Sequence, residues 1–442
     1  MTELSQDQKL QQKKQPQQQA DQVDIAIVGA GMVGMTLACL LADSGLTVRV
    51  IEARNSDRES LISAEQQQRS DAFDNRVSAL TIASQQILQS TSAWPLMQQM
   101  RITPYTRMDV WDGEGSGNIQ FNSHELQEEY LGHIVENRVT LAALYQASLA
   151  MPAIEWQSGS RLTGLSEIET DNNQQLRTLS FADGSTLKAG LVIAADGAMS
   201  NTRRLADLPM WEWDYGHHAI VTTVKVADGH QHTCWQRFTD DGPLAFLPVS
   251  DLAVSGKNDQ HCSIVWSTSP DHAAELMTLD DDAFCRALEH AIEGRLGNVT
   301  AAQPRMSVPL RQRHASRYVQ AGFAAIGDAA HTIHPLAGQG VNLGLLDAAV
   351  LAEVILDAQA AGEMWQSEYV LHRYQRQRQG ENLKMAASME GFKRLFATDA
   401  AVPRLLRNVG MSLMNKTPMI KNHVVQQAMG LSGNLPRFAR RS

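Results

Sequence analysis

The chain is 442 residues long, which is sufficient for two or three domains with buried cores. Its 38 basic and 48 acidic side chains leave a net charge of −10, which argues against nucleic acid as the main partner. Four scattered cysteines without a C-x-x-C pair favour neither a disulfide framework nor a zinc site. We therefore expect a globular protein of the reduced cytoplasm.

The N-terminal residues are rich in Gln and Lys and lack the apolar core of a signal peptide. We interpret residues 1–22 as a disordered extension outside the folded part of the chain. Elsewhere no uninterrupted apolar run approaches the roughly 18 to 20 residues that a membrane-spanning helix requires. The sequence therefore predicts no membrane span.

The first structured segment has the pattern of a dinucleotide-binding unit. Residues 24–52 predict a strand, a Gly29-x-Gly31-x-x-Gly34 turn, a helix, and a second strand that closes on Glu52. In such a unit the first glycine turns the chain, the second lets a pyrophosphate approach and the third allows close helix packing. The acid holds a ribose hydroxyl. Because the spacing and the flanking strands agree, we predict a dinucleotide site here.

Two later strands end in acid–glycine pairs. Residues 190–195 predict a buried strand that ends at Asp196-Gly197, and residues 322–326 predict one that ends at Gly327-Asp328. Ligands of parallel sheets lie at the carboxyl ends of the strands, so both acids are candidate ligand contacts. Asp328 could accept a hydrogen bond from a sugar-like hydroxyl. A plain turn is the alternative for Asp196-Gly197.

A glycine-rich loop then leads into a helix predicted over residues 342–358. Pro335, Gly338 and Gly340 keep the loop non-helical. The first N–H groups of a helix lack intrahelical partners, and the helix dipole adds partial positive charge there. This suits the N1 and O2 edge of a reduced flavin, which carries negative charge. The alternative is an ordinary strand-to-helix connection, which the other motifs disfavour.

Residues 211–309 have a different pattern, in which strand-like runs predominate and helical spacing is confined to residues 271–293. We predict a mostly antiparallel sheet that forms a second domain and covers the ligand. Its aromatic and proline side chains are candidates for an aromatic pocket, with ordinary core packing as the alternative. They are Trp213, Tyr215, Phe246, Pro248 and Trp266.

Several isolated polar residues leave alternatives open. Arg76 could neutralise a cofactor phosphate or could be an exposed loop residue. His217 and His218 are candidates for a base near a phenolic substrate, but no recognisable acid accompanies them, so a structural role is the alternative. The pairs His230-x-His232 and His331-x-x-His334 lack further ligands at metal spacing, so no metal site is predicted.

The C-terminal part combines a helical pattern with positive charge. Residues 368–396 predict a long helix, and residues 400–442 contain seven basic side chains and no acidic one. Methionines lie among these residues, and methionine-rich surface adapts to irregular apolar partners. The combination suggests contact with a membrane surface, a prenyl chain or another protein, and a buried helical core is the alternative.

On these motifs the chain resembles flavin-dependent aromatic hydroxylases of the para-hydroxybenzoate hydroxylase type, and specifically their ubiquinone-biosynthesis branch. Residues 331–344, HTIHPLAGQGVNLG, carry the most specific match. Within the branch, four segments resemble 2-octaprenylphenol hydroxylases. They are residues 132–137, 213–218, 245–248 and 262–266. The similarity extends over about residues 23–435.

The resemblance implies FAD as the cofactor, with NAD(P)H as a transient electron donor, since no second G-x-G-x-x-G turn is present. It implies no metal and no catalytic side chain that can be named. Asn137 stands where the wider class often has arginine, and the N-terminal extension lies outside the family pattern. The implied contacts of the AMP half are Gly29, Gly31, Gly34 and Glu52, and Ala30, Met32 and Arg54 are further implied cofactor contacts. Arg76 is implied at the phosphate-sugar region, Asp196 and Gly197 near both FAD and NAD(P)H, and Asp328 at the ribityl chain. Further implied cofactor contacts are Asn137, Arg203 and Gly327. Those bordering the isoalloxazine are Pro335, Gly338, Gln339, Gly340, Val341 and Asn342.

The fold class that follows is α/β (α+β), with a Rossmann-like FAD-binding domain, a second, mostly antiparallel substrate domain and a C-terminal helical region. The FAD-binding domain is expected to be discontinuous, over residues 23–95, 125–205 and 310–365. The substrate domain takes residues 96–124 and 206–309. The helical region takes residues 366–442, and residues 1–22 form the disordered extension.

The resemblance also implies a function. The expected activity is O2-dependent hydroxylation of the aromatic ring of a polyprenylphenol, such as 2-octaprenylphenol, in ubiquinone biosynthesis. O2 and the prenylated phenol are the implied partners, and a protein complex of the pathway and peripheral contact of the basic tail with the inner membrane are candidate interactions. The alternatives are a hydroxylase of a later benzoquinol intermediate, a flavin reductase, and an accessory subunit in which FAD is structural.

Overall fold

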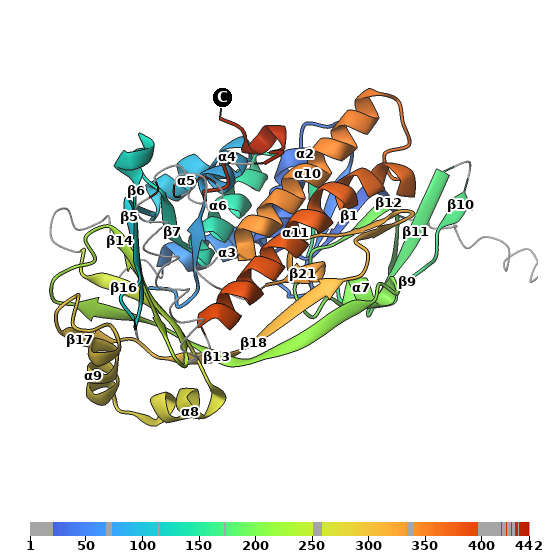
Figure 1. Cartoon of the computed structure of the whole chain (residues 1–442). Helices are drawn as coiled ribbons and strands as arrows, with labels where there is room; N and C mark the ends of the chain where they lie inside the picture. Colours follow the sequence, from blue (N-terminus) through green and yellow to red (C-terminus); the bar gives the residue numbers. More distant parts are fainter. Residues whose placement is uncertain are drawn as a thin grey trace, which may run out of the picture.

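The computed structural model describes six long segments and part of the C-terminus. The segments are residues 21–67, 73–113, 115–171, 174–250, 259–333 and 340–396, and the C-terminal part is 417, 421, 426, 429–431 and 433–441. Two large sheets and one small sheet form the frame, with helices packed on them (Figure 1). The predicted mixed α/β fold class is confirmed.

The first sheet is parallel at its centre. β1 (Gln22–Val28) pairs in parallel with β2 (Val48–Ile51) on one side and with β12 (Thr186–Ala194) on the other. β8 (Ile154–Gln157) and β20 (Phe323–Ala325) extend the sheet in parallel beyond them. The central strands are apolar runs because helices cover both faces. Antiparallel strands complete one side: β9 (Leu162–Leu165), β10 (Glu169–Asp171), β11 (Gln174–Phe181) and β19 (Val319–Gln320).

Helices pack around this sheet and enclose the largest apolar core of the described residues. α2 follows β1 directly, and α10 and α11 lie side by side across the sheet (Figure 1). The helices of this part are α2 (Met32–Leu41), α3 (Arg58–Gln67), α4 (Ile82–Ser90), α5 (Ala93–Gln99), α6 (Asn137–Leu149), α7 (Asn201–Leu205), α10 (Gly340–Ala360) and α11 (Glu368–Phe396). A small antiparallel sheet of β3 (Val77–Leu80), β7 (Gly132–Glu136) and β4 (Thr103–Tyr105) lies beside them.

The second large sheet is mostly antiparallel, in the order β21-β18-β13-β16-β15-β14-β5-β6, with β17 paired to β13. Its strands are β5 (Arg107–Asp112), β6 (Asn118–Asn122), β13 (Met210–Val226), β14 (Thr233–Thr239), β15 (Gly242–Val249), β16 (His261–Thr268), β17 (Val299–Ala302), β18 (Met306–Ala315) and β21 (His331–Thr332). β13 and β18 form a long ribbon that runs from this sheet towards the first one (Figure 1). β18 crosses residue 310, where the sequence predicted a domain boundary.

Two helices cover one face of the second sheet. α8 (Pro270–Thr278) and α9 (Asp281–Ala291) replace the single helical stretch predicted over residues 271–293. The break falls at Asp280, whose side chain accepts the N–H of Ala283 at 2.7 Å and so caps the second helix. Phe246 and Trp266 are buried in the core under these helices. For these two residues the core alternative, not the aromatic pocket, is confirmed.

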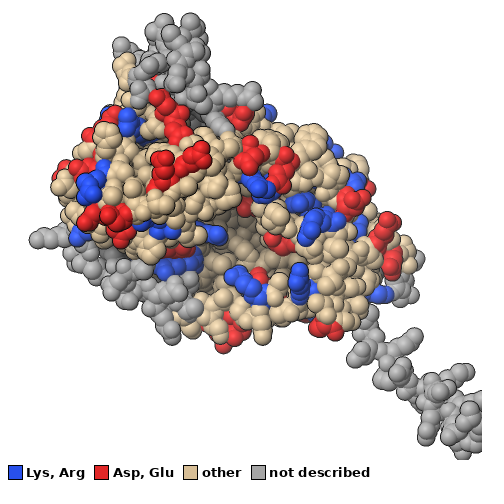
Figure 2. All heavy atoms as spheres, turned by 90° about the horizontal axis from the view of Figure 1, so that it is seen from below, with Lys and Arg blue, Asp and Glu red and all other residues tan. Residues whose placement is uncertain are grey.

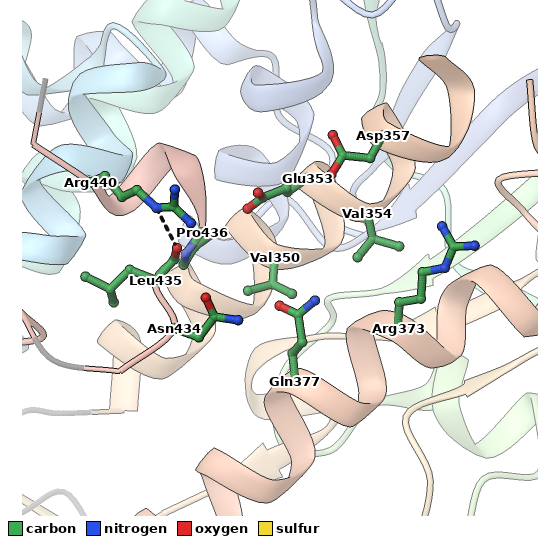
Figure 3. A pocket seen from close by; sticks show the side chains of 10 residues that line it. All are labelled: Val350, Glu353, Val354, Asp357, Arg373, Gln377, Asn434, Leu435, Pro436 and Arg440. Atoms are coloured by element: carbon green, nitrogen blue, oxygen red, sulfur yellow. Dashed lines mark hydrogen bonds between the residues drawn. The ribbon is translucent and has the colours of Figure 1, made fainter. Parts of the chain in front are cut away.

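The described C-terminal residues form ion pairs with earlier parts of the chain. Arg437 pairs with Asp357 of α10 at 2.9 Å, Arg441 with Glu128 at 2.7 Å, and Lys421 with Glu125 at 2.6 Å. Figure 3 shows residues 434–440 beside α10 and α11, around a cavity of about 290 Å³. No described helix is long and apolar enough to cross a membrane.

Candidate functional site

The glycine turn between β1 and α2 contains glycines with two different environments. A Cβ at Gly29, where φ is +113°, would lie 2.4 Å from the carbonyl oxygen of Ala195. A Cβ at Gly34 would lie 2.2 Å from the carbonyl oxygen of Gly29. A Cβ at Gly31, the N-cap of α2, would meet no heavy atom within 4 Å. Gly29 and Gly34 are therefore required for packing, whereas Gly31 borders open space.

Glu52 lies next to this turn because it directly follows β2, and the last residue of β2 pairs with the last residue of β1. One carboxylate oxygen accepts the backbone N–H of Ala30 at 3.3 Å, at the start of the turn that continues through Met32. The other accepts the backbone N–H and Nε of Arg54, at 3.0 and 3.2 Å. The Glu52 side chain is largely buried, whereas that of Arg54 is 73% exposed. The carboxylate is thus held at the edge of the turn.

The second acid–glycine pair follows β12, which lies beside β1. Asp196 accepts the backbone N–H and the hydroxyl of Thr202 at 3.0 and 2.9 Å, and it also accepts the hydroxyl of Ser200. Its side chain therefore binds the first turn of α7, whose N-cap is Ser200. Gly197 has φ +83°, and a Cβ there would meet nothing within 4 Å. This turn, like Gly31 in the first one, therefore borders open space.

Arg203 of α7 links the two acid–glycine pairs. It is buried, and its Nη1 donates to the carbonyl oxygen of Ala329 at 3.1 Å, directly after Asp328. Its Nε has no hydrogen-bond partner among the residues that the structure describes. Burial lowers the pKa of Arg203, and the nearby Asp196 opposes this. A buried guanidinium edge is therefore left for a further acceptor.

The third pair follows β20, the parallel neighbour of β12. Gly327 has φ +57°, and the side chain of Asp328 is exposed. Even so, enough protein surrounds the Asp328 carboxyl that burial raises its pKa, while His331 and Arg313 act in the opposite direction. Figure 2 shows a hollow in the middle of one face of the protein, with Lys and Arg side chains along its rim.

The N-terminus of α10 meets these turns. A Cβ at Gly344 would lie 2.6 Å from Val33 of α2 and 3.3 Å from the Cα of Gly327, so the two helices approach closely at this point. A Cβ at Gly340 would be in open space, and Val341 packs against the core. The three acid and glycine motifs and this helix start therefore converge on one site. Pro335, Gly338 and Gln339 lie outside the described residues.

Asn342 of α10 has a buried side chain with partners within the protein. Its Oδ1 accepts the backbone N–H of Thr81 at 3.1 Å and the hydroxyl of Ser84 at 2.7 Å. Its Nδ2 donates to the carbonyl oxygen of Ala79 at 2.8 Å. The side chain therefore fixes the start of α10 to β3 and the residues that follow it, and the cofactor contact of Asn342 stays a prediction.

Arg76 and Asn137 lie together, although they are far apart in the sequence. The N–H of Asn137 donates to the carbonyl oxygen of Arg76 at 2.9 Å, and its Oδ1 accepts the hydroxyl of Ser78 at 2.6 Å. The Arg76 side chain is exposed. Both residues remain candidates for cofactor contact.

The histidine pair on β13 has serine partners. The Nδ1 of His217 lies 3.4 Å from the hydroxyl of Ser267, and the Nδ1 of His218 lies 3.0 Å from that of Ser307. Each Nδ1 atom therefore lies within reach of a serine hydroxyl. In the described part of the chain no group of three or more His, Cys, Asp or Glu residues is arranged to hold a metal ion.

One set of residues behind the site was not found from the sequence. His331, Asp347 and Arg378 form a buried network of hydrogen bonds. The available signal was a lone aspartate in the otherwise apolar run LGLLDAAVLA of α10. A charge in such a run indicates a buried partner, which local sequence does not name.

The comparison with known proteins agrees with this geometry. The profile of a family described as "FAD binding domain" matches residues 22–386. The chain is 36% identical, over 92% of its length and 98% of the relative's, to the 3-demethoxyubiquinol 3-hydroxylase of Escherichia coli (strain K12). It is 30% identical to the mitochondrial ubiquinone biosynthesis monooxygenase of Homo sapiens, over 91% of each chain. The chain belongs to this family of FAD-dependent monooxygenases.

Solved structures share the fold of this monooxygenase. A probable FAD-dependent monooxygenase of Pseudomonas aeruginosa has a TM-score of 0.68 at 21% identity, and covers 88% of this chain and 99% of its own. The p-nitrophenol 4-monooxygenase of Pseudomonas putida has a TM-score of 0.70 at 18% identity, over 94% and 99%. At these identities the likeness concerns the fold alone.

The residues of the site fit FAD, the cofactor of the family. Open space lies over Gly31, Gly197 and Gly340, where a pyrophosphate or a ring could approach the backbone. Glu52 is a carboxylate at the edge of the first turn, and Asp328 is an exposed carboxylate after β20. The Nε of Arg203 is an unused buried donor among the described residues. The site thus offers donors, acceptors and space in one place.

Proposed function

We propose that this monooxygenase hydroxylates the aromatic ring of a polyprenylated phenol or quinol in ubiquinone biosynthesis, with O2 as the oxygen source and NAD(P)H as the reductant. The observation that carries the proposal is the convergence of the Gly29–Gly34 turn, the pairs at residues 196–197 and 327–328, and the start of α10. Relatives 30% and 36% identical, named for ubiquinone biosynthesis or its intermediates, support the pathway.

Bound FAD would supply electron transfer from NAD(P)H and activation of O2. The residues of the chain would position it. Gly31 would let the pyrophosphate approach the start of α2, and Glu52 would accept a hydrogen bond from the ribose. Asp328 would accept a hydrogen bond from the ribityl chain, and the N-terminus of α10 would place partial positive charge near the flavin ring.

The substrate ring would enter between the FAD site and the second sheet, where the protein excludes water from the reacting atoms. We assign no acid–base role to His217 or His218, whose Nδ1 atoms lie near serine hydroxyls. Orientation and the exclusion of water are therefore the main tasks of the protein, and the ring must itself be electron-rich.

Two substrates are supported by different observations. The first is a 2-polyprenylphenol such as 2-octaprenylphenol, supported by residues 132–137, 213–218, 245–248 and 262–266, which resemble hydroxylases of that compound. The second is a later benzoquinol intermediate, supported by the Escherichia coli relative named 3-demethoxyubiquinol 3-hydroxylase. The two differ in ring substitution and share the phenolic ring and the prenyl chain.

The test is a product analysis with labelled oxygen. FAD-loaded protein is given NAD(P)H, oxygen-18 O2 and either a 2-polyprenylphenol or a demethoxyubiquinol, and the products are weighed by mass spectrometry. One labelled oxygen in a hydroxylated product supports the proposal and names the substrate. Consumption of NAD(P)H without label in either product, or with only H2O2 formed, contradicts it in favour of a flavin reductase or an accessory subunit.

We further propose peripheral membrane contact, or docking to a protein complex of the pathway, through basic residues 404–416. Lys421, Arg437 and Arg441 are paired with acids of the same chain, and Arg440 donates to the carbonyl oxygen of Leu435 at 2.9 Å. The remaining basic residues, Arg404, Arg407 and Lys416, lie outside the described residues and are the candidates. Flotation with anionic liposomes tests the membrane contact. Exchange of these three residues for Gln should reduce flotation, and equal flotation would refute the contact.

A further inference from the structure

A buried polar network lies behind the Gly327–Asp328 turn, and the function proposed above does not use it. At its centre is Asp347 of α10, which is 0% exposed. Its Oδ2 accepts the backbone N–H of Gly327 at 3.1 Å and lies 2.5 Å from Nε2 of His331. One carboxylate oxygen therefore holds the segment that contains Asp328 from both of its ends.

The other carboxylate oxygen of Asp347 faces α11. Its Oδ1 accepts Nε of Arg378 at 2.8 Å and Nδ2 of Asn382 at 3.3 Å. Arg378 also donates to Oδ1 of Asn382 at 2.8 Å and to the carbonyl oxygen of Leu343 at 3.4 Å. Asn382 in turn donates to the hydroxyl of Tyr318 at 3.3 Å. A network in which each member is satisfied rigidifies its surroundings.

The groups that surround Asp347 determine its charge and the position of the proton on His331. Burial opposes ionisation of Asp347, but His331 and Arg378 outweigh it and lower the pKa of Asp347 to about 2. Asp347 is thus a carboxylate at neutral pH and can only accept hydrogen bonds. It follows that His331 carries a proton on Nε2 and donates it to Asp347.

The backbone of α10 also contacts the turn. A Cβ at Gly344, one turn before Asp347, would lie 3.3 Å from the Cα of Gly327 and 2.6 Å from Val33. This leaves no room for the turn to move towards the helix. Asp347 prevents it from moving away, because it binds Gly327 and His331.

We propose that Asp347 is a positioning residue of the FAD site. Through Gly327 and His331 it sets the position of Asp328, and through Arg378 it couples that position to α11. The proposal rests on the function proposed above, because it takes Asp328 as a contact of the ribityl chain. Asp347 itself lies behind the turn and acts only through these other residues.

The test measures FAD binding rather than turnover. The apoproteins of Asp347→Asn and of the double variant Asp347→Asn with Arg378→Met are titrated with FAD, followed by flavin fluorescence. The double variant removes the buried cation that the single one leaves unpaired. We expect the Kd of FAD to rise at least tenfold in both, and the visible absorption bands of bound flavin to shift at saturation.

Glu363→Gln is the matched control. It is the same change from carboxylate to amide and also removes an arginine partner, Arg373 of α11, but the pair is partly exposed. We expect the control to bind FAD with the Kd and the absorption bands of the wild type. If the folded double variant binds FAD within twofold of the wild-type Kd, the proposal is overturned.

A second pair of variants serves if neither Asp347 variant folds. His331→Ala removes one donor to Asp347, and His331→Gln keeps a donor of similar reach. We expect the Ala variant to raise the Kd at least tenfold and the Gln variant to restore most of the affinity; a wild-type Kd for His331→Ala overturns the proposal. Failure of the proposed function has a different signature, since the wild type would bind FAD without transferring labelled oxygen.

Discussion

Exchange of Gly31 for Ala separates the folding of the glycine turn from its use in binding FAD. A Cβ at this position meets no heavy atom within 4 Å, and φ is −70°, which alanine adopts freely. Gly31 is the N-cap of α2, where alanine is a poorer cap, so the apoprotein should lose about 0.5–1 kcal/mol of stability. If the open space holds a pyrophosphate, the methyl group should raise the Kd of FAD at least tenfold, which is about 1.4 kcal/mol.

Gly34→Ala is the same chemical change three residues later, with a larger expected loss of stability. Its Cβ would lie 2.2 Å from the carbonyl oxygen of Gly29, whereas ordinary contacts begin at 3.4 Å. The turn or the helix must therefore move by about 1 Å, and strain of this kind costs about 1–3 kcal/mol or more. We expect the apoprotein of Gly34→Ala to melt well below that of Gly31→Ala.

Thermal melting of both apoproteins and fluorescence titration with FAD are the two assays. Titration of Gly31→Ala with a wild-type Kd would refute the pyrophosphate contact at this turn. Equal melting temperatures for the two variants would refute the packing argument for Gly34. Because each variant adds one methyl group, differences between them report position rather than size.

Three further outcomes are expected. Burial lowers the pKa of His133, His230 and His314 from 6.5 to about 4. At a pH between these two pKa values the unfolded chain binds the protons and the folded chain does not. The free energy of unfolding should therefore fall as the pH drops from about 6.5 towards 4, by about 3 kcal/mol for each histidine. A free energy of unfolding that stays constant from pH 7 to 5 in urea titrations would contradict this. Asn342→Leu should cost the apoprotein about 2–4 kcal/mol in the same assay, because it leaves buried partners unpaired, and a loss below about 1 kcal/mol would argue against that role. Arg441→Ala should cost at most about 1 kcal/mol and less at high salt, because its pair with Glu128 is partly exposed; a larger, salt-independent loss would be inconsistent with a surface pair.

The sequence by itself determined the local units of this protein. The Gly29-x-Gly31-x-x-Gly34 turn, its flanking strands and Glu52 lie within about 30 residues, and hydrophobic periodicity with glycine spacing is sufficient to define them. The long helix over residues 368–396 was also predicted from periodicity and is α11 in the structure. These features depend on backbone geometry and local contacts, which a short stretch of sequence specifies.

Only the tertiary structure decided the contacts between distant segments. Asn342 binds Thr81, which is 261 positions earlier, and Asp347 binds Arg378 on another helix. Phe246 of β15 and Trp266 of β16 lie in the core under α8 and α9, whereas Ala245 and Leu247 of β15 belong to another core, so only the packing decided which core each side chain joins. The type of a residue indicates that it needs a hydrogen-bonding partner or a buried environment. Which group supplies that partner or environment depends on how the helices and strands pack.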